Sequence, residues 1–253
     1  MPFTAAHPAL ILPLQRLHSR WFSTTGLIVG SIAPDFAYFL PYRRFGTLSH
    51  SLKGLFLFDL PMALALAILF HLLIRDQVVQ NLPDYLRERA LSIKPVKLGS
   101  YLLSNWHIFA ISALIGSFTH LFWDSFTHAN EYFVRNYSHF FLQPVSLGII
   151  ELPLSRAIQH ISTIVGLSVL GWHISTLPVA QVKQKPWLSW MPYWILVGFI
   201  GAVLMLLKLP GHLRLDNLER LVIPFLTGNL LAVILLGGLS KLRSLLYSST
   251  KGN

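Results

Sequence analysis

Residues 116–128 read GSFTHLFWDSFTH, and this stretch decides how the rest of the chain is interpreted. In a helix, His120, Asp124 and His128 follow one another at intervals of four residues and therefore project from one face. Aromatic and aliphatic side chains cover the other faces. Imidazole and carboxylate groups one turn apart can bind a single divalent cation. The alternative is a polar helix end at the headgroup level of a membrane, and this segment alone favours neither.

Composition places the chain among integral membrane proteins. Hydrophobic residues make up 53% of the 253 residues, and charged residues 12%, against roughly a quarter in an average soluble domain. The net charge is +10, but Lys and Arg form short clusters between apolar segments instead of one basic stripe. We therefore expect no nucleic-acid partner. Because cysteine is absent, any metal must be held by His, Asp, Glu or main-chain oxygen.

About five segments are predicted to span the membrane, at approximately 54–74, 101–123, 161–178, 187–207 and 221–239. A short helical hairpin precedes them, with arms of roughly 15 Å that are too short to cross a hydrocarbon core of about 30 Å. Thr4 is expected to cap the first arm, and Pro8 suits its first turn.

The expected fold class is therefore all-α, a polytopic α-helical membrane protein. Residues 1–175 are predicted to form a helical membrane domain that carries the candidate metal site. Residues 176–253 are predicted to form C-terminal membrane helices, an anchor or scaffold, as one structural unit.

Polar residues from four separate segments are predicted to meet at one membrane boundary. The hairpin returns Asp35 to the level of His7, and His50 directly precedes the first span. Taken singly, Asp35 is also a plausible turn residue and His50 a plausible interfacial residue. The residues at this common end of the helices are His7, Asp35, His50, Asp59, His120, Asp124 and His128. Such convergence favours a shared metal site over scattered structural residues.

The predicted metal ligands are His7, Asp35, His50, His120, Asp124 and His128. Asp35 and Asp124 are also candidates for bridging two ions or for taking a proton from water, and His128 for carrying a proton. Zinc is the first choice for mixed imidazole and carboxylate ligands, followed by manganese and ferrous iron. A metal of this kind activates water and stabilises charge on a phosphoryl or acyl oxygen.

Several motifs occur in a fixed order over roughly residues 1–175. They are MPFT-x-x-His7-Pro8, Gly30-Ser31-x-Ala33-Pro34-Asp35, Ser49-His50-Ser51 and Ser117-x-x-His120-x-x-Trp123-Asp124-x-x-Thr127-His128. Together they resemble an uncharacterised bacterial membrane family, domain of unknown function 4184. That family is similar in motif order to inner-membrane proteins classed as metal-dependent hydrolases, and remotely to the helical zinc-dependent phospholipases C. The resemblance implies a phosphodiesterase-like or phospholipase-like hydrolase of the bacterial inner membrane, acting on a lipid or another phosphoester or ester.

Two other functions remain open. A metal transporter would need further ligands along a path across the membrane, where His71, His107 and His173 occur without an accompanying carboxylate. A non-catalytic scaffold would use the same polar cluster as a hydrogen-bond network between helices. In that case Ala substitutions would reduce folding and expression instead of metal content.

Overall fold

The computed structural model describes residues 3–16, 21–40, 44–148, 150–208 and 219–250. About 78% of these described residues are helical, and one small two-stranded sheet accompanies the helices. Within the described residues, four helices are long and apolar enough to cross a membrane: Leu55–Gln80, Leu98–Asp124, Leu154–Ser175 and Leu221–Tyr247. They expose large apolar side chains such as Leu103 (86%) and Ile164 (66%), as expected of helices that face lipid. The prediction of an all-α polytopic membrane protein is confirmed.

Two further apolar helices are shorter than the four candidate spans. Met191–Leu207, where the fourth of the five predicted spans lies, is one of them, and Thr4–Leu14 is the other. The latter is the first arm of the N-terminal hairpin, which contains η1 (Thr4–Ile11) and α1 (Leu12–Arg16), while α2 (Thr24–Ile32) is the second arm. Residues 17–20 between the arms lie outside the described residues.

The expectation that Thr4 caps the first arm is wrong. The residue that precedes the helix is Phe3, and no side chain caps this end. The Thr4 hydroxyl instead donates a hydrogen bond of 2.5 Å to Oδ2 of Asp35. A capping hydroxyl accepts a hydrogen bond from a backbone N–H, whereas here the hydroxyl donates to a buried carboxylate, which is a strong acceptor.

The chain folds into two compact units. The first contains Met1–Ala67 and Gly99–Thr176, and the second contains Ile68–Leu98 and Leu177–Asn253. The segment that links the first two candidate spans therefore belongs with the C-terminal helices.

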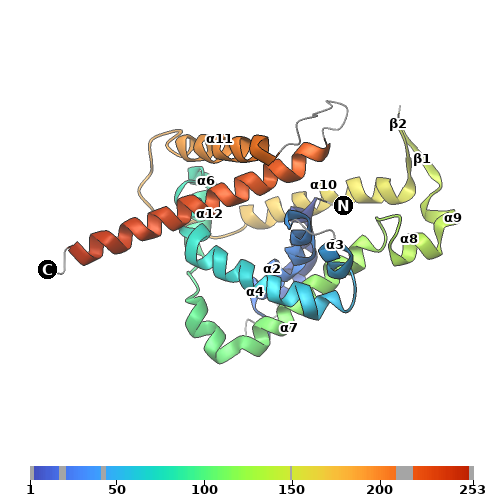
Figure 1. The fold of residues 1–253 in the computed structure, drawn as a ribbon, viewed down its shortest axis with the longest axis horizontal. Coiled ribbons are helices and arrows are strands. Elements are labelled where there is room, and N and C mark those ends of the chain that lie inside the picture. The colour runs from blue at the N-terminus through green and yellow to red at the C-terminus, as the bar shows by residue number, and fades with distance from the viewer. Residues whose placement is uncertain (1–2, 17–20, 41–43, 149, 209–218, 251–253) are drawn as a thin grey trace. The chain divides into compact units, whose positions relative to one another are not determined.

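The first unit contains the N-terminal hairpin, two long helices and the short elements that connect them (Figure 1). Besides η1, α1 and α2, its elements are η2 (Ala33–Phe39), α3 (Arg44–Ser49), η3 (Leu55–Asp59), most of α4 (Leu60–Leu69), α7 (Leu98–Asp124), α8 (Tyr132–Asn136), α9 (Ser138–Phe141), β1 (Pro144–Leu147), β2 (Ile150–Pro153) and α10 (Leu154–Ser175). The strands β1 and β2 pair antiparallel. The sequence prediction did not include them, since two strands of four residues leave little periodicity to detect.

Helices α2 and α7 cross where small residues let their backbones touch. A Cβ atom at Gly30 would lie 2.2 Å from the carbonyl oxygen of Ala113, and one at Gly116 would lie 2.3 Å from that of Leu27. Such close approach between apolar helices is typical of membrane proteins. The Ser117 hydroxyl donates a hydrogen bond of 3.0 Å to the Gly30 carbonyl at this crossing. The crossing fixes the polar end of α7 against the residues that follow α2.

The second unit is built on a helix pair, α11 (Met191–Lys208) and α12 (Glu219–Thr250). Its buried core is formed by Val197, Ala232 and Val233. The other elements of this unit are η4 (Phe70–Ile74), α5 (Arg75–Gln80) and α6 (Asp84–Ser92).

Candidate metal centre

Four acidic and imidazole side chains converge inside the first unit. Asp35 comes from η2, His50 directly follows α3, and His120 and Asp124 lie one turn apart on α7. The exposed fraction of the residue is 2% for Asp35, 0% for His120 and 1% for Asp124. Each of the four residues offers one ligand atom, and these atoms all lie within 4.8 Å of one another. The group therefore has the composition and the compactness of a metal site.

The distances between these ligand atoms are those expected of a cation site and not of a hydrogen-bond network. Nε2 of His120 lies 3.4 Å from Oδ1 of Asp35 and 3.4 Å from Oδ2 of Asp124. Nε2 of His50 lies 3.6 Å and 3.7 Å from the same two oxygens. These separations are too long for N–H···O hydrogen bonds, and none of the four atoms has a hydrogen-bond partner among the described residues. Two ligand atoms about 2.0–2.1 Å from one ion, at a tetrahedral angle, are about 3.4 Å apart. The observed spacing therefore fits a shared cation.

The outer nitrogens of the two imidazole rings are held by oxygen atoms. Nδ1 of His120 donates a hydrogen bond of 2.8 Å to the carbonyl of Ser31, at the end of α2. Nδ1 of His50 lies 3.2 Å from the carbonyl of Gly46 and 2.9 Å from the hydroxyl of Ser49. When Nδ1 carries the proton, the lone pair of Nε2 faces the group, which is the tautomer that binds a metal.

The Asp35 carboxylate is held in its ionised form. Burial alone would raise the pKa of the Asp35 carboxyl, but its contacts with His120 and His50 and the hydrogen bond from Thr4 outweigh burial. The pKa of Asp35 therefore lies well below its usual range. The Thr4 bond occupies Oδ2 and leaves Oδ1 directed at the two imidazole rings.

His7 lies beside the group, against the second oxygen of Asp124. Its ring stacks on the ring of His120 with centroids 3.8 Å apart, and its Nε2 atom lies 3.6 Å from Oδ1 of Asp124. Burial is the main cause that lowers the pKa of His7 to about 4, and the neighbouring His120 adds to this shift. His7 is therefore neutral near pH 7, the form that can ligate a metal or accept a proton. Asp124 presents Oδ2 to His50 and His120 and Oδ1 to His7.

His128 lies at the accessible edge of the same carboxylate. Its Nδ1 atom lies 3.2 Å from the main-chain oxygen of Asp124 and 3.6 Å from the carboxylate Oδ2. The His128 side chain is 26% exposed, compared with 10% for His50. Burial lowers the pKa of His128 in spite of the nearby negative charge of Asp124. Nδ1 lies against Thr127 and Asp124, while Nε2 is buried and has no hydrogen-bond partner among the described residues. His128 therefore offers an unpaired ring nitrogen beside the centre.

Asp59 is a further buried carboxylate near this group. It ends η3, a π-helical turn, and is 0% exposed. Neither of its oxygens has a hydrogen-bond partner among the described residues, although it lies within electrostatic range of His50 and His120. An unpaired buried carboxylate lowers stability, and π-helical turns occur frequently at functional sites. In its ionised form Asp59 would add negative potential to the cation site.

Two substitutions of Asp59 separate its effect on metal binding from its effect on the stability of the fold. Asp59→Leu keeps the branched shape and should raise the free energy of unfolding of metal-free protein by about 1–3 kcal/mol, because it removes two unsatisfied oxygens. It should also weaken metal binding, because it removes a negative charge. Asp59→Asn should weaken metal binding without the gain in stability. Thermal unfolding and metal titration measure both effects, and equal metal affinity in all three proteins would contradict the electrostatic role.

A chain of ligands leading away from the centre is absent from the described residues. His107 is exposed on α7, and His173 is half-buried on α10. Within the described ranges no second set of three or more His, Asp or Glu residues offers ligand atoms close enough to share an ion. The further ligands that a transport path requires are therefore not found in the described part of the chain.

Comparison with known protein families gives one match. The family model described as Domain of unknown function (DUF4184) covers residues 1–237. The chain belongs to this family. The DUF4184 match includes every predicted ligand, and it also extends over α11 and most of α12, beyond the 1–175 region of the sequence resemblance. Comparisons with curated proteins and with solved structures give no significant match.

In this DUF4184 chain the six residues predicted as ligands lie in one cluster. Asp35, His50, His120 and Asp124 form the compact group, while His7 and His128 lie against Asp124. Sequence reasoning did not find the groups that orient these ligands, namely the main-chain oxygens of Ser31 and Gly46 and the hydroxyl of Thr4. The motif Gly30-Ser31 is visible in the sequence, but the role of a main-chain acceptor does not depend on residue type.

Proposed function

We propose that this chain is a membrane-embedded, metal-dependent hydrolase that cleaves a phosphoester or carboxylic ester at the surface of the bacterial inner membrane. The observation that carries the proposal is the set of buried, facing ligand atoms of Asp35, His50, His120 and Asp124, which have no hydrogen-bond partners among the described residues. Burying such groups without compensation costs several kcal/mol each. Natural proteins keep an arrangement of this kind where it serves a function.

The donor set fits a divalent cation. Two ionised aspartates balance a charge of +2, and two neutral imidazoles complete a mixed nitrogen and oxygen set that zinc favours, with manganese and ferrous iron next. When bound, such a cation supplies a Lewis acid that lowers the pKa of water and offsets negative charge on a phosphoryl or acyl oxygen.

The surrounding residues suit the proton transfers of ester hydrolysis. Oδ2 of Asp124 faces His120, and Oδ1 faces His7. The carboxylate can therefore orient a polar group between these two residues. His7 is neutral and shielded from solvent. His128 lies beside Asp124 with a buried, unpaired Nε2 atom and can accept or donate a proton there. Proton transfer is therefore assigned to His128 and Asp124, and metal binding to Asp35.

The place of the cluster along its helices suits a substrate at the membrane surface. Asp124 ends the candidate span Leu98–Asp124, and His50 lies five residues before the candidate span Leu55–Gln80 begins. The ester and phosphoester bonds of lipids lie at that boundary of the hydrocarbon core. The resemblance of the sequence motifs to those of metal-dependent hydrolases and zinc-dependent phospholipases C is the reason that we propose hydrolysis as the reaction.

A test of the proposed function uses detergent-purified protein with phosphodiester and carboxylic-ester probes in mixed micelles. Chelator treatment should lower the hydrolytic rate by about 10²-fold or more, since a catalytic cation contributes several kcal/mol of transition-state stabilisation. Adding back zinc, manganese or ferrous iron should restore the rate. Hydrolysis that persists in chelated, metal-free protein would contradict the proposal. A protein that binds metal but hydrolyses neither probe class would favour the alternative function, a non-catalytic scaffold.

A further inference from the structure

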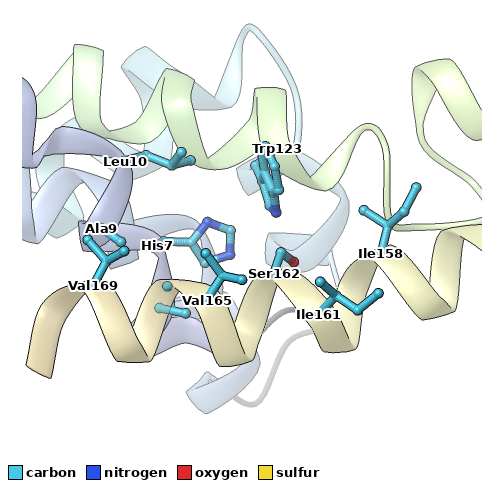
Figure 2. Close-up of a pocket in the computed structure, with 11 residues that line it drawn as sticks. His7, Ala9, Leu10, Trp123, Ile158, Ile161, Ser162, Val165 and Val169 are labelled. Atoms are coloured by element: carbon cyan, nitrogen blue, oxygen red, sulfur yellow. The ribbon is translucent and has the colours of Figure 1, made fainter.

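An apolar groove passes directly beside the candidate metal centre. It has a volume of about 390 Å³ and lies between η1, the end of α7 and the face of α10 (Figure 2). This volume is in the range of about 300–1,000 Å³ that small-molecule sites occupy. Its walls include Leu10, Trp123, Ile161, Val165 and Val169. In Figure 2 the ring of His7 lies between the two long helices, among these apolar side chains.

His7 gives the groove polar character next to the centre. His7 lines it, and the Nε2 atom of the same residue lies 3.6 Å from Oδ1 of Asp124. Ser162 also lines it, but the Ser162 hydroxyl donates to the carbonyl of Gln159 on its own helix. A ligand in the groove would therefore meet hydrocarbon along its length and the metal centre at His7.

The position and length of the groove indicate which apolar ligand it fits. Both α7 and α10 are candidate membrane spans, and the groove-lining residues Ile161 and Val165 are each 54% exposed. The groove therefore opens toward the medium that surrounds these helices, which is lipid. The lining residues of α10 run from Ile158 to Val169, a length of about 17 Å at 1.5 Å per residue. Half of a hydrocarbon core of about 30 Å is similar in depth.

We propose that this groove binds one acyl chain of a membrane lipid and thereby presents the headgroup ester of that lipid to the metal centre. The proposal rests on the proposed function for the identity of the reacting bond, but chain binding itself requires no turnover. It assigns the substrate class as lipids that carry a long acyl chain, in preference to water-soluble esters.

Photolabelling tests chain binding independently of catalysis. The protein is reconstituted in nanodiscs of phosphatidylethanolamine and phosphatidylglycerol, which include a phosphatidylethanolamine with a diazirine at the end of one acyl chain. After irradiation, mass spectrometry should find the label enriched on groove residues such as Leu10 and Val169 relative to Leu103, which is 86% exposed on α7 outside the groove.

Two neighbouring positions on α10 give a matched pair of variants. Val165→Trp places an indole in the groove and should lower labelling of the groove by about tenfold or more, the change that a loss of 1.4 kcal/mol in binding produces. Ile164→Trp adds the same side chain at a 66% exposed position that does not line the groove, and labelling should stay as in the wild type. If labelling follows general lipid exposure, or if Val165→Trp leaves it unchanged, the proposal is overturned. Cross-links from groove residues to a second copy or to another part of the chain, in place of lipid, would also overturn it.

Hydrolysis of the two probe classes separates this proposal from the proposed function. Val165→Trp should lower the hydrolysis of long-chain lipids by a larger factor than the hydrolysis of short water-soluble phosphodiesters, and Ile164→Trp should leave both rates unchanged. Groove labelling in a protein that hydrolyses no ester would support chain binding and contradict the hydrolase. Hydrolysis of soluble esters without groove labelling would support the hydrolase and contradict chain binding.

Discussion

Asp124→Asn is expected to lower hydrolysis by about 10³-fold and to release the metal. The substitution keeps the size of the side chain but removes the charge that faces His50 and His120 on one side and His7 on the other. Removing one member of a buried charged set costs about 3–5 kcal/mol, which corresponds to roughly 10²–10⁴ in affinity. Steady-state kinetics and metal analysis of the same preparation measure both effects.

The matched control for Asp124→Asn is Asp76→Asn. The Asp76 side chain is 81% exposed and pairs with Arg75 at the surface, where an ion pair contributes little. Metal content and activity should therefore remain at the wild-type level in Asp76→Asn. A folded Asp124→Asn protein that retains its metal and its activity would show that this carboxylate is not part of the centre.

Gly30→Val is expected to destabilise the first unit by about 3 kcal/mol or more and to disrupt the centre indirectly. A Cβ atom at residue 30 would lie 2.2 Å from the carbonyl oxygen of Ala113, and a backbone atom cannot rotate out of the way. Helices α2 and α7 would have to separate, which would stretch the hydrogen bonds from Ser117 to Gly30 and from His120 to Ser31. For a chain of this size the loss corresponds to a fall in melting temperature of about 6–12 °C.

Gly171→Val is the matched control, and it tests whether a valine in place of any glycine in an apolar helix destabilises the protein. Gly171 lies on α10, and a Cβ atom there would meet no other atom within 4 Å. Its replacement should change the free energy of unfolding by less than about 0.5 kcal/mol. Equal melting temperatures for Gly30→Val and Gly171→Val would contradict the close crossing of α2 and α7.

The features that sequence periodicity controls were predictable. The four-residue spacing of His120, Asp124 and His128 placed them on one helix face, and the short hairpin arms brought Asp35 back to the level of His7. Both expectations use only the rise and turn of a helix, and the structure has the four segments meeting at one end. The apolar composition likewise predicted membrane helices, because no other class of protein carries so few charges over such long apolar segments.

The features that depend on side-chain direction were not predictable. Thr4 had the residue type of a helix cap, yet its hydroxyl bonds to Asp35, thirty-one positions further along the chain. The acceptor for His120 is a main-chain oxygen of Ser31, which any residue could supply. Val165 has the same aliphatic character as its neighbour Ile164, and the packing of α10 against η1 and α7 alone decides which of them lines the groove.

The central claim is that Asp35, His50, His120 and Asp124 hold one cation. The most direct test is metal analysis and X-ray absorption on detergent-purified wild type beside His120→Ala and His107→Ala, the latter an exposed histidine on the same helix. We predict about one equivalent of zinc, manganese or iron in the wild type, with nitrogen and oxygen ligands at about 2.0–2.2 Å and no sulfur. We predict the same content in His107→Ala and none in His120→Ala. A wild type that stays metal-free after reconstitution, or equal loss of metal in both variants, would contradict the claim.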